Sequence, residues 1–79
     1  MNNFTGTVSG IDVVEMPGNI VRCFAFVSRD ASDEIQVITD VHALQTVLES
    51  ASVRKVKVSV TFTTSGVEKK LTRVQVLDR

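Results

Sequence analysis

Apolar and polar side chains alternate along most of the chain, a pattern typical of strands that bury one face. The clearest alternation covers residues 55–63. Its apolar positions are Val56, Val58, Val60 and Phe62. Alternation and β-branched residues also predict strands at residues 4–14, 20–28, 34–39 and 68–77, separated by short polar or glycine-containing segments.

Glycine positions refine this assignment. In the first strand the apolar phase changes beside Gly10, which predicts a β-bulge there. After the first strand, Pro17 is followed by Gly18, a pair that favours a type II turn. The first two strands are therefore expected to form a hairpin.

Helical spacing occurs in one segment. Apolar residues recur at intervals of three and four from Val41 to Ala51, including Leu48. Either Thr39 or Asp40 is expected to cap the start of this segment. We therefore predict a helix that begins at position 41 and ends near position 50.

The predicted order of three strands, one helix and two strands resembles the OB-fold, a five-stranded Greek-key barrel with a helix between strands three and four. The resemblance covers nearly the whole chain. It implies an antiparallel barrel in which the bulge at Gly10 lets the first strand pair with both halves, and Leu44 and Leu48 pack against one end. An open antiparallel sheet with the helix on one face and an SH3-like barrel with a long helix are the competing arrangements.

The resemblance also implies a ligand-binding face, because OB-folds bind ligands across strands two and three, between the loops that follow strands one and four. On this chain the candidate binding face consists of Arg22, Phe24, Phe26, Gln36 and Ile38. The flanking loops contain Pro17, Gly18, Ser65 and Gly66. Both loops are very short, and the first carries the acidic Glu15, which departs from the usual binding loops.

Composition and length indicate one small domain spanning residues 1–79. The 43% of hydrophobic residues predicts a folded rather than a disordered chain. A core of this size stabilises a fold by only about 3–5 kcal/mol. The single cysteine excludes an internal disulfide, so association with a partner subunit is the natural additional source of stability.

Charge is distributed unevenly, although the net charge is zero. Acids predominate in residues 1–51 and bases in residues 52–79. The candidate anion-binding residues of the basic part are Lys55, Lys57, Lys69, Lys70 and Arg73. They would bind a phosphate backbone while aromatic side chains stack on unpaired bases. Alternatively, the lysines form the solvated face of an edge hairpin and prevent edge-to-edge association, and the neutral net charge favours this interpretation.

The second predicted strand has apolar residues on both faces, unlike an antiparallel strand with one solvated face. One face carries Val21, Cys23, Ala25 and Val27, and the other carries Ile20, Phe24 and Phe26. In one interpretation the face with the larger side chains fills the barrel while the small residues lie under a side chain or loop. In the other, one set contacts another subunit or a ligand.

Candidate catalytic chemistry is sparse. His42 is the only histidine, and a metal site needs three or four ligands. Cys23 lies between apolar neighbours, which predicts an inert core thiol. No nucleophile elbow, phosphate loop or zinc-protease motif occurs, so we predict a non-enzymatic protein with no cofactor or metal.

These observations leave two hypotheses for function. The first is a homo-oligomer or protein-binding module, with residues 21–27 in or beside the contact and the basic last hairpin outside it. The second is a single-stranded nucleic-acid-binding protein that uses Arg22, Phe24 and Phe26 with the basic residues around them. The start of the chain does not resemble a secretory signal and no apolar run is long enough to cross a bilayer, so we expect a cytoplasmic protein without a membrane partner.

Overall fold

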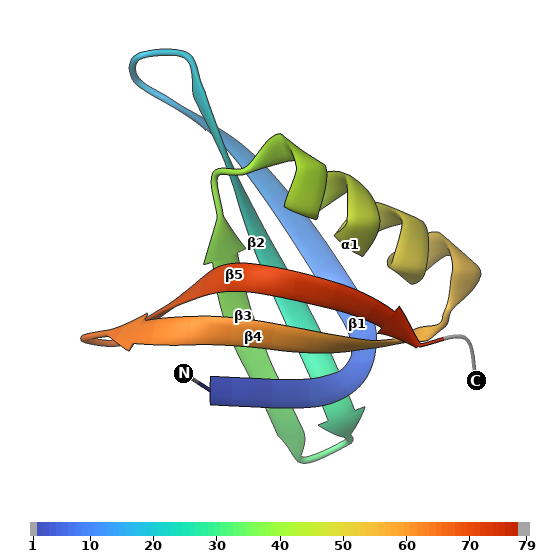
Figure 1. Cartoon of the computed structure of the whole chain (residues 1–79). Helices are drawn as coiled ribbons and strands as arrows, with labels where there is room; N and C mark the ends of the chain where they lie inside the picture. Colours follow the sequence, from blue (N-terminus) through green and yellow to red (C-terminus); the bar gives the residue numbers. More distant parts are fainter. Residues whose placement is uncertain (1, 78–79) are drawn as a thin grey trace.

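A computed structural model describes residues 2–77 and contains five strands and one helix in the predicted order. The strands are β1 (Asn2–Met16), β2 (Ile20–Asp30), β3 (Asp33–Thr39), β4 (Lys57–Ser65) and β5 (Glu68–Leu77). The helix α1 (His42–Arg54) lies between β3 and β4 in the chain. The strands close into a barrel in the order β1-β2-β3-β5-β4, which confirms the predicted fold class (Figure 1).

One pairing in the barrel is parallel. Ile38 of β3 pairs with Lys70 of β5 in parallel, whereas the other four pairings are antiparallel. The predicted antiparallel barrel is therefore a mixed one. Strand direction reverses at each antiparallel step, so a closed ring with an odd number of strands must contain at least one parallel step.

β1 is the longest strand and pairs with two neighbours. Residues 2–7 pair with β4, and residues 7–16 pair with β2. The register shifts between Val8 and Gly10, which confirms the predicted bulge. Figure 1 shows β1 bending between the two halves of the barrel.

The barrel interior is filled by the smaller side chains of β2. Cys23, Ala25 and Val27 are fully buried, whereas Phe24 and Phe26 point to the other side and are only partly buried. The interpretation in which the larger side chains of this strand fill the barrel is therefore wrong, because a closed five-stranded barrel has little interior volume. The core is completed by residues of the other elements: Phe4, Val8, Val37, Leu48, Ala51, Val58, Val60, Phe62 and Leu71.

The helix closes one end of the barrel, and its first turn lacks the predicted cap. Leu48 is fully buried, as the apolar spacing predicted, and Leu44 packs against the core. The N-cap residue is Val41, and no side chain caps it. Thr39 Oγ1 accepts a hydrogen bond from the Val41 N–H at 3.0 Å, but Thr39 lies two residues before the N-cap, and Asp40 binds Arg22 instead. The helix also continues to Arg54, beyond the predicted end near position 50.

β1 and β2 extend past β3 as a two-stranded arm, in which residues 14–16 pair with residues 20–22 and Val13 lies at the base (Figure 1). β3 pairs with β2 only from Cys23 onward. The predicted hairpin is confirmed, and its tip has three residues because Met16 pairs with Ile20. Gly18 adopts φ 87°, the value that a type II turn requires at its third position.

Candidate interaction surface

The five residues of the candidate binding face lie together on the outer side of β2 and β3. Phe24 pairs with Ile38, and Phe26 pairs with Gln36. Arg22 lies two residues before Phe24 on β2, on the same side of the sheet. We call this surface, with the β1 residues paired to it, the outer face.

The Phe26 ring lies against the bulge of β1. Gly10 pairs with Phe26, and a Cβ placed on Gly10 would lie 3.5 Å from Phe26 Cδ2. The ring therefore packs against a glycine backbone that offers no side chain of its own. This contact fixes Phe26 on the outer face and leaves it partly exposed.

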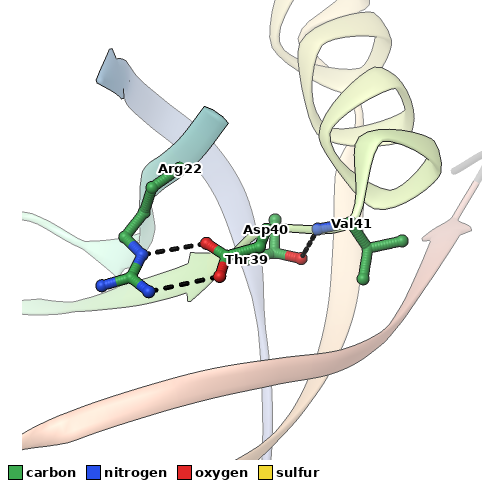
Figure 2. Close-up of polar contacts among 4 residues, drawn as sticks. All are labelled: Arg22, Thr39, Asp40 and Val41. Carbon is green, nitrogen blue, oxygen red and sulfur yellow. Dashed lines mark hydrogen bonds and ion pairs between the residues drawn. The ribbon is translucent and has the colours of Figure 1, made fainter. Parts of the chain in front are cut away.

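Arg22 and Asp40 form a bidentate ion pair at one end of the outer face (Figure 2). Arg22 Nε–H donates to Asp40 Oδ1 at 2.9 Å, and Nη2–H donates to Oδ2 at 3.2 Å. These hydrogen bonds, followed by the attraction of opposite charges, hold the pKa of Asp40 below its usual value and raise the pKa of Arg22. The guanidinium charge is thus offset by its own partner.

An open hollow of about 180 Å³ adjoins this ion pair, between the end of β3 and the start of β5. Its lining residues are Arg22, Ile38, Thr39, Asp40, Val41, Glu68, Lys70 and Leu71. The lining contains two bases and two acids, so the hollow has an apolar floor and balanced charge.

The opposite end of the outer face is acidic. Ser9 Oγ and Ser28 Oγ both donate to Glu34 Oε2, at 2.7 and 2.8 Å. These two hydrogen bonds lower the pKa of Glu34. Asp12 of β1 pairs with Phe24 and adds a further acid beside the aromatic residues.

The five candidate anion-binding residues do not form one site. Lys57 pairs with Leu77 at one end of the β4–β5 hairpin, whereas Lys70 pairs with Thr63. Lys57 and Thr63 are six positions apart on β4, which corresponds to roughly 20 Å along a strand. The end near Lys57 also contains Lys55, and the end near Lys70 contains Lys69 and Arg73. Of the five, only Lys70 borders the hollow beside the outer face.

The arm exposes apolar side chains on both of its faces. Val13, Val14, Ile20 and Val21 each keep between 42% and 48% of their surface exposed. Val13 and Val21 project from one face of the hairpin, and Val14 and Ile20 project from the other. Beyond the barrel, the outer edges of both arm strands pair with none of the other described strands.

The arm is not predicted from the sequence, because β1 extends to Met16 and the predicted first strand ends at position 14. The signal was present in the sequence, since apolar residues fall on both phases at the end of β1 as well as at the start of β2. That double-sided pattern was assigned to the second strand alone.

Chemistry-bearing side chains are few in the described part of the chain. Cys23 is a fully buried free thiol, and burial raises its pKa. His42 is exposed in the first turn of α1. Residues 2–77 contain no cluster of three or more His, Cys, Asp or Glu side chains that would hold a metal ion, and no helix of theirs reaches the length and apolarity of a bilayer span.

Comparison with models of known protein families and with curated proteins finds no match to this chain. The geometry and charge of its surfaces are therefore the basis for proposing a function.

Proposed function

We propose that this chain is an OB-like barrel that acts as a non-enzymatic protein-interaction module and self-associates through the arm and the outer face of β2. The observation that carries the proposal is the arm, with apolar side chains exposed on both faces and unpaired outer edges.

An uncovered arm of this kind is costly in water. A two-stranded hairpin alone is marginally stable, and the β3 pairing that supports β2 begins only at Cys23. Contiguous exposed apolar side chains usually mark a contact surface, and unpaired strand edges can accept a further strand. A partner that covers the arm would bury the apolar side chains and pair with the strand edges.

A second copy of the chain is the proposed partner. Closed two-fold dimers are the most frequent homo-oligomers, and they bury the same surface of both subunits. The arm suits such an arrangement because its two faces and two edges are available together. Association would also extend a core that is small for an independent fold.

The charge of the outer face favours a protein partner over a nucleic acid. Asp12 and Glu34 lie on this face, and Asp40 offsets the charge of Arg22. Phosphate groups bind where cationic side chains are available, and here the lysines are divided between two ends of another hairpin. The proposal therefore assigns the partly exposed Phe24 and Phe26 to a protein contact.

The first experiment measures mass by light scattering across a hundredfold dilution that starts at micromolar concentration. We expect the parent chain to have about twice the 8.6 kDa mass of one subunit at the upper end of the series. The double variant Val14→Lys with Ile20→Lys places two charges on one face of the arm and should have the mass of one subunit. A parent protein that is monomeric throughout the series would contradict the proposal.

Val67→Lys is the matched control. Val67 is 93% exposed in the turn between β4 and β5, which is a different hairpin from the arm. It adds the same kind of charge to an exposed valine, so the control should associate like the parent. An equal loss of association in the control would indicate a general charge effect.

Single-stranded nucleic-acid binding is the alternative function, favoured by the partly exposed aromatic pair on β2. A fluorescence titration with random single-stranded DNA at two salt concentrations tests it. Affinity that falls steeply with salt and is lost in Lys55→Glu with Lys57→Glu would support this alternative. No binding at low salt would exclude it.

A further inference from the structure

A second hollow, of about 260 Å³, lies where β1 passes from β4 to β2. It adjoins the end of the outer face at Ser28, away from the arm. Its lining residues are Thr5, Gly6, Thr7, Ser28, Arg29 and Lys57.

The sheet register explains why these residues meet. Thr7 is the residue at which β1 changes partners, and it pairs with Ser28 on one side and with Lys57 on the other. Residues paired across neighbouring strands project to the same face of the sheet, so these three side chains lie in one row. Thr5 follows on the same face of β1.

Two cations border the hollow. The guanidinium of Arg29 lies over the Phe4 ring, with its central carbon 4.4 Å from the ring centroid. Arg29 Nη1 also contacts Asp33 Oδ2 at 3.1 Å, which leaves further N–H groups of the guanidinium available. Lys57 is exposed and forms no ion pair within the described residues.

No acid lines the hollow, although acids contact two of its lining residues. Asp33 binds Arg29, and Glu34 accepts the Ser28 hydroxyl at 2.8 Å. These contacts orient the guanidinium and occupy the serine hydroxyl. The donors left for a ligand are Arg29, Lys57 and the Thr5 hydroxyl. The Thr7 hydroxyl donates to the Ser28 carbonyl at a long 3.5 Å and would exchange this bond for one to the ligand.

We propose that this hollow binds a phosphate-type oxyanion. Arg29 and Lys57 supply charge-assisted hydrogen bonds, which are shorter and stronger than neutral ones, and the two threonines supply hydroxyl donors. The four donors of this site lie outside the arm, so the site does not depend on self-association through the arm.

The test is a titration of the whole chain with inorganic phosphate, followed through the backbone amide NMR signals of Thr5, Thr7 and Arg29. We expect saturable shifts of these signals. Lys57→Gln should weaken the affinity about tenfold, the expected effect of removing one charge-assisted hydrogen bond. Lys57→Arg should retain most of the affinity.

Lys69→Gln is the control, because it removes the same charge near the other end of the hairpin. It should leave the phosphate affinity unchanged. Equal shifts with chloride at matched ionic strength, or an equal loss of affinity in the control, would overturn the proposal.

Dimethyl phosphate, titrated in the same way, distinguishes a site for free phosphate from one for a phosphodiester group. Saturable binding of either anion at these amides supports the oxyanion site, and binding of neither refutes it.

Discussion

Gly6 shows how one residue allows the barrel to close. A Cβ placed there would lie 2.3 Å from the Ser28 carbonyl oxygen, so a side chain would collide with the backbone of β2. We predict that Gly6→Ala lowers the free energy of unfolding by about 1–3 kcal/mol, the usual cost of overpacking. Urea denaturation measures this change.

Gly10→Ala is the comparison, because its Cβ would meet only Phe26 Cδ2 at an ordinary 3.5 Å. This variant should retain most of the stability of the parent. Similar losses in both variants would show that the close approach at Gly6 is not the cause.

The Arg22–Asp40 pair gives a residue-scale prediction for pH. The pKa of Asp40 is lowered in the folded chain, so its contribution to stability is present above the unfolded value of about 3.9 and is lost as pH falls through the lower folded value. The stability difference between the parent and Asp40→Asn should therefore shrink as pH is lowered from 7 to about 2. Thermal melts across this range measure it.

Asp12→Asn is the control for this titration, because Asp12 forms no ion pair among the described residues. The stability difference between this control and the parent should change less with pH. A gap between the parent and Asp40→Asn that stays constant down to about pH 2 would contradict the role assigned to the pair.

At the scale of elements, α1 is held by its buried face. Leu48 is fully buried at the end of the barrel, so Leu48→Ala should cost about 2–5 kcal/mol through lost burial and an unfilled cavity. Val53→Ala tests the exposed face of the same helix, where 83% of the side chain is exposed, and should change stability by less than about 0.5 kcal/mol. Equal melting temperatures for Leu48→Ala and Val53→Ala would contradict this packing.

The sequence pattern located the elements well because alternation and helical spacing report which face of each segment is buried. The N-cap of α1 was predicted wrongly. Asp40 binds Arg22 rather than the first turn of the helix, and Arg22 lies 18 residues away in the chain. The sequence pattern ended β1 too early for a similar reason. Local alternation does not show that a strand continues beyond the barrel when both of its faces are apolar.

For the whole molecule, the structure brings the residues of the candidate binding face together and separates the basic residues. The face came together because Phe24 and Phe26 occupy one phase of a strand whose neighbour is β3. The lysines were grouped by nearness in sequence, but a hairpin places the start of β4 beside the end of β5. Lys57 and Lys70 therefore lie at opposite ends, and only the register reveals this.

The double pairing of β1 has a consequence for how fast the chain folds. The β1–β2 and β4–β5 hairpins close over short loops, but the pairing of Asn2 with Phe62 joins residues about 60 positions apart. Closing so long a loop costs entropy before its contacts repay it, and proteins rich in such distant contacts fold in milliseconds to seconds rather than microseconds. We therefore expect the two hairpins to form early and their joining along the first residues of β1 to limit the folding rate.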